Sequence, residues 1–247
     1  GSSDSIASAN IMLNSAVAES LRIYADRLEE AKDFESALHE MIRKTIKDHK
    51  RIIFNGNGYD DAWIREAVKD RGLLNYRTSV DCIPHLLDEK NVDMLTSLGV
   101  FTLDELRSRR DIMLENYCKT VVIEANTMIN MVHKRIAPAI VRFTADLAKQ
   151  AKDKKALSPY LKCSYETELV GKLSVLTDLI TEKTDSLEEA VQRLDQAQDI
   201  LDEAVMIRDT VLPGMSEVRK PCDQAEILTA KSYWPFPTYG DILFSVK

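Results

Sequence analysis

Residues 169–204 read LVGKLSVLTDLITEKTDSLEEAVQRLDQAQDILDEA, and apolar side chains return in this stretch at every seventh position. A second series of mostly small apolar residues lies between them, with Lys183 as its one polar member. Two apolar positions in each heptad are typical of a coiled coil, and small residues let two helices approach closely. Because the phase does not break, we expect one helix from Ser164 to Arg208. The two series are Leu173, Ile180, Leu187, Leu194 and Leu201, and Leu169, Leu176, Ala190, Ala197 and Ala204.

A partner helix of similar length is expected upstream. Thr102 and Glu105 have the spacing of a capping box, in which the Thr side chain caps the helix and the Glu side chain returns to the Thr backbone. They predict a helix over residues 103–155. Pro138 lies inside it and predicts a kink near residues 134–138, because proline lacks the N–H that the helix needs there.

The whole pattern predicts an all-α fold: an elongated helical bundle with a long antiparallel coiled-coil hairpin and an extended aromatic C-terminal tail. A further helix is expected over residues 210–230. The 247 residues include only 8 Gly and 7 Pro, which are the residues that turns consume. No alternation of apolar and polar residues is long enough to predict a strand.

The first helices carry apolar residues at steps of three and four, which predicts a buried stripe. The pattern pauses near residue 30 and then resumes up to a basic run. Its members are Ile11, Leu13, Val17, Leu21, Tyr24 and Leu28, followed by Phe34, Leu38, Met41, Ile42 and Ile46.

The basic run, Arg43–Arg51, holds five basic residues against one acidic residue, Asp48. Cations in the last turn of a helix interact favourably with the helix dipole, and this is the interpretation that we favour. The alternative is a surface for an anionic partner.

A glycine-rich loop, Asn55–Gly58, follows the basic run. A phosphate-binding loop is one interpretation, because helix N-termini attract anions. Asp60 and Asp61 favour a simple turn instead, since two carboxylates at the start of the next helix cap it and repel phosphate. That short helix is expected to end at Gly72. Two more short helices should follow, the first capped by Ser79.

Composition excludes several classes of protein. The formal net charge is −7, from 33 Lys and Arg against 40 Asp and Glu, which does not suit nucleic-acid binding. The sequence contains no stretch of about 18 apolar residues, which is the length that a membrane-spanning helix needs. The four cysteines form no C-x-x-C pair, as expected for reduced thiols in the cytoplasm.

No pattern of catalytic, cofactor-binding or metal-binding residues is present. The histidines are scattered singly, and no Glu-x-x-His pair exists to build a metal site in a helical bundle. Walker, Rossmann, G-x-S-x-G and H-E-x-x-H motifs are also missing. We therefore assign no catalytic, cofactor-binding or metal-binding residue, and we expect His133 to be structural or on the surface rather than a ligand.

Residues 233–244 read YWPFPTYGDILF and form the most aromatic stretch of the chain. Pro235 and Pro237 restrict their predecessors to extended geometry, so we expect no helix here. Aromatic surface is costly to leave in water, so the segment should lie in a groove. The groove belongs either to its own bundle or to a neighbouring subunit.

At this point the sequence resembles the C-terminal region of type III glutamine synthetase. Six blocks carry the resemblance and together span most of the chain. They are Ala7–Leu13 (ASANIML), Ile53–Tyr59 (IFNGNGY), Pro84–Asn91 (PHLLDEKN), Gly99–Leu106 (GVFTLDEL), Glu115–Thr120 (ENYCKT) and Tyr233–Phe244 (YWPFPTYGDILF).

The resemblance implies an enzyme that ligates ammonia to glutamate with ATP and Mg²⁺ or Mn²⁺. It also implies that the nucleotide and metal ligands precede Gly1, so no catalytic residue is carried over and the isolated chain is expected to be inactive. Implied partners are the rest of the same polypeptide and neighbouring subunits of a homo-oligomer, with neither nucleic acid nor a membrane. The alternative is a free-standing helical protein-interaction module.

With this resemblance the chain divides into four expected segments. Residues 1–50 are helices that continue from an upstream catalytic domain, and residues 51–101 are a short-helix segment. Residues 102–232 are the long-helix bundle with its coiled-coil hairpin, and residues 233–247 are the extended tail.

Overall fold

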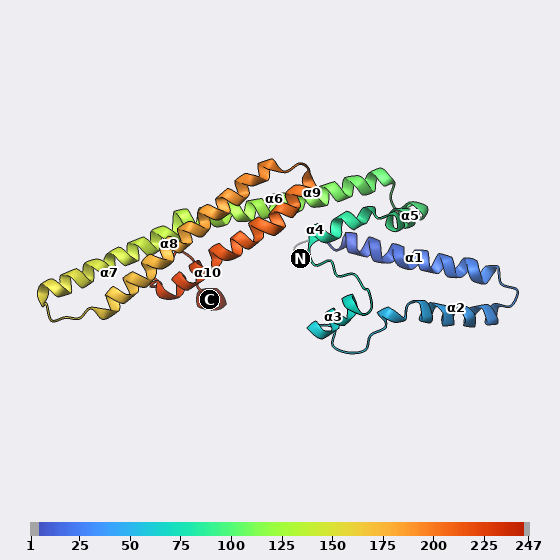
Figure 1. Ribbon diagram of the computed structural model, residues 1–247, viewed down its shortest axis with the longest axis horizontal. Coiled ribbons are helices and arrows are strands. Elements are labelled where there is room, and N and C mark those ends of the chain that lie inside the picture. Colours follow the sequence, from blue (N-terminus) through green and yellow to red (C-terminus); the bar gives the residue numbers. More distant parts are fainter. Residues whose placement is uncertain (1–4, 245–247) are drawn as a thin grey trace. The chain divides into compact units, whose positions relative to one another are not determined.

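The computed structural model describes residues 5–244, and every regular element within that range is helical, which confirms the all-α prediction (Figure 1). The chain divides into two compact units, Gly1–Met113 and Leu114–Lys247. The boundary between them falls inside α6, the helix Leu103–Met131.

The first unit consists of short and medium helices. Local signals start or end several of them: Asp60 caps α3 by accepting a hydrogen bond from the Ala62 N–H at 2.8 Å, and Gly72 and Gly99 adopt φ values of 61° and 65°. Left-handed backbone of this kind is open to glycine at little cost. The elements are α1 (Ala7–Glu29), α2 (Phe34–Asp48), η1 (Lys50–Ile52), α3 (Asp61–Lys69), α4 (Ser79–Cys82), η2 (Ile83–Leu87) and α5 (Glu89–Ser97).

The cap of α4 differs from the prediction by one residue. Thr78, not Ser79, has extended backbone, and its hydroxyl accepts the Asp81 N–H at 3.1 Å. Ser79 already lies in the first turn, where its side chain cannot reach the free N–H groups. The capping box of Thr102 is present as predicted: Glu105 accepts the Thr102 N–H at 2.8 Å, and Thr102 accepts the Glu105 N–H at 3.3 Å.

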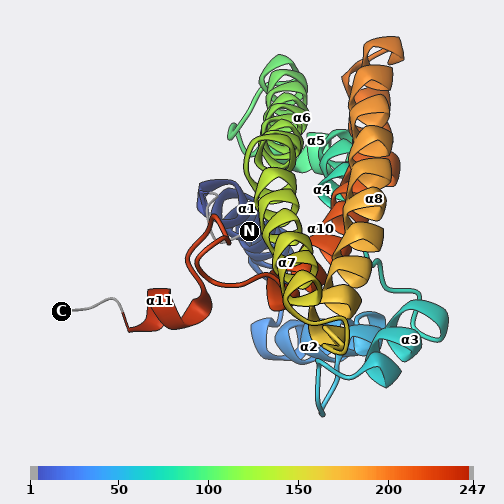
Figure 2. The same ribbon diagram turned by 90° about the vertical axis from the view of Figure 1, so that its left-hand side faces the viewer.

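The second unit is built from long helices that lie side by side. α8 packs against both α7 and α10, and Figures 1 and 2 show that each of these neighbours runs antiparallel to it. The predicted antiparallel hairpin is therefore present as α7 and α8. After α6 the elements are η3 (Val132–Ile136), α7 (Ala137–Leu157), α8 (Ser164–Gln192), η4 (Arg193–Gln196), α9 (Ile200–Met206), η5 (Ile207–Val211), α10 (Leu212–Leu228) and α11 (Tyr239–Leu243).

The single helix predicted from Ser164 to Arg208 is wrong. The chain leaves α8 after Gln192 and reverses, and Asp199 then caps α9 by accepting the N–H groups of Leu201 and Asp202 at 2.9 and 2.8 Å. A strong N-cap side chain competes with helix continuation, and a heptad count does not register this competition. Leu201 and Ala204 still have the heptad spacing, but they belong to α9, which begins the segment that returns along α8 as η5 and α10.

Two π-helical turns interrupt the long helices. η3 precedes Pro138 and η5 precedes Pro213, each proline lying in the first turn of the α-helix that follows. A wide turn accommodates the carbonyl that proline leaves without an N–H partner. The irregularity predicted near residues 134–138 thus takes the form of a π turn.

The core of the second unit lies along α8. Leu173, Ile180 and Leu187 are fully buried there, together with Ile140 from α7 and Val211 from η5. Burial of one such side chain stabilises a fold by about 1.5–3 kcal/mol. α10 comes close to α8 at Gly214, where an added Cβ would lie 3.2 Å from Cδ1 of Leu187.

Candidate interaction surfaces

The glycine-rich loop Asn55–Gly58 leads into a helix N-terminus that the chain itself occupies. Asn57 Oδ1 accepts the Tyr59 N–H at 3.1 Å, and Asp60 Oδ1 caps α3. Asp61 adds a second carboxylate in the first turn. Because Asp60 already accepts one of the free N–H groups and two carboxylates at this position repel phosphate, the geometry supports a turn rather than a phosphate site.

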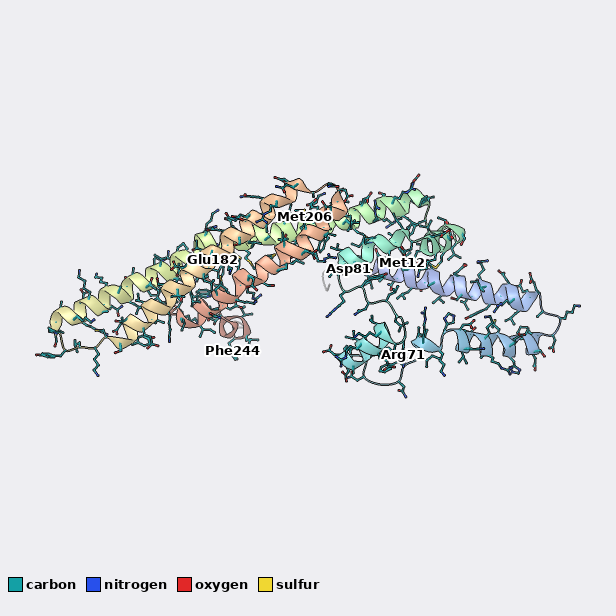
Figure 3. The ribbon with its side chains drawn as sticks, viewed as in Figure 1. Met12, Arg71, Asp81, Glu182, Met206 and Phe244 are labelled. Carbon is teal, nitrogen blue, oxygen red and sulfur yellow. The ribbon has the colours of Figure 1, made fainter. Side chains whose placement is uncertain are left out.

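An aromatic stack holds the two ends of this loop together. The rings of Phe54 and Trp63 lie 3.7 Å apart, and the Arg71 guanidinium lies over Trp63 at 4.8 Å. Arg71, at the end of α3 in Figure 3, also donates to Glu66 at 2.7 Å and to the Ile53 carbonyl at 2.8 Å. Sequence reasoning missed this arginine, whose only signal is its place one residue before the left-handed Gly72.

The histidines lie in separate places, and each has a local structural contact or an exposed position. His133 Nε2 lies 2.7 Å from Glu188 Oε1 in a partly exposed pair between the second unit's helices. His85 stacks on Tyr76 with ring centres 4.1 Å apart. Within residues 5–244, no three His, Cys, Asp or Glu side chains gather as a metal site would require.

The cysteine thiols are all free. Burial raises the pKa of Cys118 and of Cys222 to about 11, with nearby carboxylates adding to the effect. A thiol with so high a pKa is protonated at neutral pH and is a poor nucleophile. These two cysteines therefore act as small apolar core residues.

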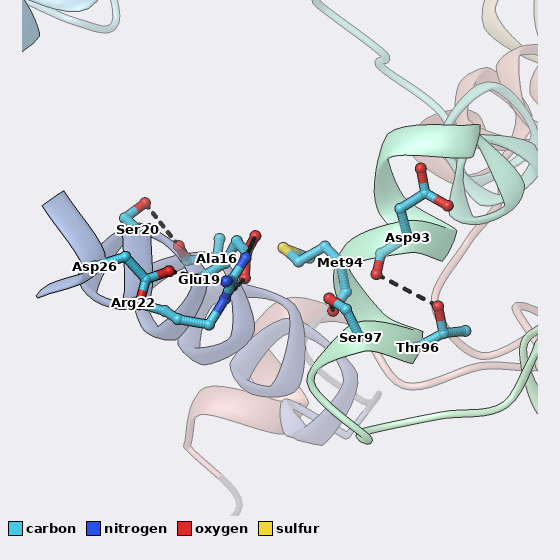
Figure 4. Close-up of polar contacts among 9 residues, drawn as sticks. All are labelled: Ala16, Glu19, Ser20, Arg22, Asp26, Asp93, Met94, Thr96 and Ser97. Atoms are coloured by element: carbon cyan, nitrogen blue, oxygen red, sulfur yellow. Dashed lines mark hydrogen bonds and ion pairs between the residues drawn. The ribbon is translucent and has the colours of Figure 1, made fainter. Parts of the chain in front are cut away.

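Half of the stripe predicted to be buried on α1 is exposed instead, while Ile11, Tyr24 and Leu28 are partly buried. Leu13, Val17 and Leu21, which we call the outer stripe, are 66%, 58% and 61% exposed. Only Ser15 is buried in α1, and no residue is buried in α2. The prediction failed because α1 packs through its opposite side, where Met94 of α5 points toward the turn around Ala16 (Figure 4).

The exposed face of α1 is an unusual surface for a helix of this length. Arg22 links Glu19 and Asp26 into a charged network on the α5 side, at 2.7 and 3.2 Å (Figure 4). This charged network lies on the α5 side of the helix, so it does not cover the outer stripe.

None of the helices in the described part of the chain is long and apolar enough to cross a bilayer.

The basic run ends α2, as the dipole interpretation requires. Lys44 pairs with Asp48 at 2.6 Å along the helix. Arg43 and Lys47 are exposed and have no ion-pair partner among residues 5–244. They flank Ile42 and Ile46, which are also exposed, so the end of α2 is both cationic and apolar.

The aromatic segment lies against its own helices. The Tyr233 ring centre is 5.1 Å from that of Phe143, and its hydroxyl donates to Asp146 at 2.5 Å, which raises the pKa of Tyr233. Trp234 and Phe236 meet edge to face at 6.5 Å. Of the two alternatives, these contacts support a groove of the same bundle.

The prediction that no residue of 233–244 is helical is wrong at its end. Residues 239–243 form α11, and Thr238 opens it with a capping box to Asp241. Both prolines precede this box, so their backbone restriction no longer applies. Lys231 pairs with Asp241, and this pair together with the hydrogen bonds from Thr238 lowers the pKa of Asp241 to about 2.

A groove of about 970 Å³ lies beside the aromatic segment, between α6 with η3 on one side and α10 on the other. We call it the tail groove. Its lining is mainly apolar, and Ile123 and Ile227 are among the exposed residues that face it. Sequence reasoning missed it, although both isoleucines are apolar residues that no predicted core stripe includes. Such surplus apolar residues are a signal of a second surface.

Known proteins resemble this chain over most of its length. A family model described as "Glutamine synthetase C-terminal domain" matches residues 37–155. A glutamine synthetase of Butyrivibrio fibrisolvens is 35% identical over 87% of this chain and 31% of that protein. The type-3 glutamine synthetase of Dictyostelium discoideum is 30% identical, and the match covers 99% of this chain and 34% of that protein.

A glutamine synthetase of Bacteroides fragilis is 26% identical, with 99% of this chain and 35% of that protein covered. The chain thus spans about a third of the length of the curated relatives that it matches. The resemblance predicted from the sequence blocks is confirmed: this chain is a relative of the C-terminal region of glutamine synthetases, type-3 enzymes included.

Proposed function

We propose that this chain is the helical C-terminal part of a cytoplasmic glutamine synthetase, an enzyme that ligates ammonia to glutamate with ATP. In that enzyme it supplies packing surfaces to the rest of the polypeptide and to neighbouring subunits, and it supplies no reacting group. The observation that carries the proposal is the outer stripe of α1. Leu13, Val17 and Leu21 form a continuous apolar face that the described residues leave exposed.

The cost of that exposure supports a covering partner. Each large apolar side chain gains about 1.5–3 kcal/mol when it leaves water, so three on one face favour burial strongly. The relatives are about three times as long as this chain, so they contain further residues that could cover such a face.

ATP and Mg²⁺ or Mn²⁺ belong, in this proposal, to the longer enzyme. The described residues do not fit a metal site, because their carboxylates are spread over separate helix surfaces and many are engaged in local ion pairs. We therefore assign no chemical step to this chain.

A glutamine-forming assay tests the first half of the proposal. The purified 247-residue chain, supplied with ATP, glutamate, ammonia and Mg²⁺, should form no glutamine. Turnover by the chain alone would contradict a non-catalytic role.

A chimera tests the second half. In the Butyrivibrio fibrisolvens enzyme, this chain replaces the segment that it matches, and glutamine formation should be retained. Val17→Asp with Leu21→Asp should then lower activity at least about tenfold, because two carboxylates cannot be buried without partners. Ala18→Asp is the matched control, since Ala18 is exposed on α1 but lies off the outer stripe. Equal activity of all three chimeras would contradict a packing role for the stripe.

The free-standing interaction module remains the second candidate, because the same exposed face would also suit an unrelated partner. It predicts that the chimera with the unchanged chain forms no glutamine.

A further inference from the structure

Two described surfaces of this chain have opposite charge and matching apolar character. The tail groove belongs to the second unit, and the cationic end of α2 belongs to the first. Neither surface is explained by the contacts within its own unit.

The tail groove is apolar inside and acidic along its sides. Met128 and Trp234 are part of its lining, and Glu124 and Glu226 line it from α6 and α10. Neither glutamate has an ion-pair partner among residues 5–244. A third carboxylate, Asp223, is paired with a lining arginine at 3.2 Å, so the groove keeps an excess of negative charge.

The end of α2 has the complementary pattern. Ile42 and Ile46 are 46% and 54% exposed, and a spacing of four residues places them on one face of the helix. Arg43 and Lys47 follow each of them directly and are exposed without ion-pair partners in the described part of the chain. A helix docks in an apolar groove through apolar residues on one face, and the two cations beside this pair would complement an acidic groove.

We propose that the face of α2 formed by residues 42–47 of one copy enters the tail groove of a second copy. Ile42 and Ile46 cover the apolar lining, and Arg43 and Lys47 lie toward Glu124 and Glu226. This inference rests on the proposed function, because it assigns one of the subunit contacts that the packing role requires.

The geometry of such a contact has a consequence for assembly. The two surfaces differ, so each copy offers one of each and the contact is heterologous. Heterologous contacts join copies head to tail and close into rings when the rotation allows it. Opposite charge makes the association weaken as salt rises.

Sedimentation of the 247-residue chain over a concentration series tests the proposal through a charge exchange. The wild-type chain should self-associate. Arg43→Glu with Lys47→Glu should weaken association at least about tenfold, because like charges then face each other. Glu124→Lys with Glu226→Lys should weaken it to a similar degree, and the chain that carries all four substitutions should regain most of the wild-type association.

Control variants and circular dichroism keep the outcome clear. Arg65→Glu and Asp178→Lys change exposed charges on α3 and α8 that belong to neither surface, and they should leave association unchanged. A wild-type chain that stays monomeric would overturn the proposal and assign the cationic end of α2 to another occupant. The proposal would also be overturned if either double variant associated as strongly as the wild-type chain. The same holds if the chain with all four substitutions were folded but associated no more strongly than the double variants. None of these results bears on the glutamine-forming assay, so the two proposals fail separately.

Discussion

The helices α1 and α2 of the first unit and the helices α7, α8 and α10 of the second differ in what they bury. Both sets have apolar residues at helical spacing, and both lie antiparallel to a neighbour. Yet Leu173, Ile180 and Leu187 of α8 are fully buried, whereas α2 buries no residue and α1 buries only Ser15. The comparison shows that apolar residues at helical spacing form one face of a helix, and that this face becomes part of a core only where another helix covers it.

The difference follows from the number of neighbours. α8 packs against both α7 and α10, so two helices cover its apolar residues. α1 contacts α2 and α5 through a side that leaves the outer stripe free. A helix with apolar side chains on more than one side needs more than one partner.

The largest expected effect is the contrast between Leu187→Asp and Val17→Asp. An unpaired carboxylate at the buried Leu187 should destabilise the second unit by ~4 kcal/mol or more. The same change at Val17, which is exposed, should leave stability within about 0.5 kcal/mol of wild type. Chemical denaturation followed by circular dichroism measures both. Comparable losses at the two positions would erase the distinction between the two regions.

Tyr233→Ala should have the next largest effect. It removes the ring that packs on Phe143 and the hydroxyl that donates to Asp146, so we expect a clear fall in the unfolding midpoint, smaller than that of Leu187→Asp. Tyr160→Ala is the control, since Tyr160 is 93% exposed and has little packing to lose. The same denaturation experiment compares them. A melt of the Tyr233 variant that matches the control would mean that the tail adds nothing to the bundle.

Acid should release α11 before the bundle unfolds. The pKa of Asp241 is about 2 in the folded chain, lowered from an ordinary 3.8 by Lys231 and Thr238. A lowered folded pKa stabilises the charged form, so the contribution is complete above pH 4 and is lost as pH falls toward 2. Backbone NMR signals of residues 239–243 should report this loss. Asp241→Asn should remove the pH dependence, and an unchanged acid transition in that variant would contradict the assignment.

The smallest expected effect compares two glycines. At Gly171 of α8 an added Cβ meets nothing within 4 Å, so Gly171→Ala should stabilise by about 0.5–1 kcal/mol through helix propensity. At Gly214 the same Cβ would lie 3.2 Å from Leu187 Cδ1, so crowding should offset that gain. Thermal melts of the two variants measure the difference. Equal gains would show that α8 and α10 are not closely packed at this point.

The sequence predicted what depends on local chemistry. The capping box of Thr102, the cap at Asp60 and the helix end at Gly72 are all present, because each is decided within four or five residues. The antiparallel pairing of long helices was also predictable, since the stripes of α7 and α8 need each other. The four-segment division of the chain remains a prediction.

The rest depends on contacts between distant residues. The reversal after Gln192 was missed because Leu201 and Ala204 keep the heptad phase while lying in another helix. The outer stripe was assigned to the core because periodicity does not say which side a partner takes. The tail groove forms only when α6, α10 and the aromatic segment meet, so no local pattern contains it.

The π turns at η3 and η5 give each long helix one wide step in its backbone. Successive residues of an α-helix are rotated by about 100°, so removing one residue from such a step would swing every later side chain by that angle. For η3 this would carry Ile140 and Phe143 out of the interior. The extra residue of the π turn therefore decides which way all later side chains of the helix face. The apolar residues before and after the turn lie on one face of the helix only because that residue is present.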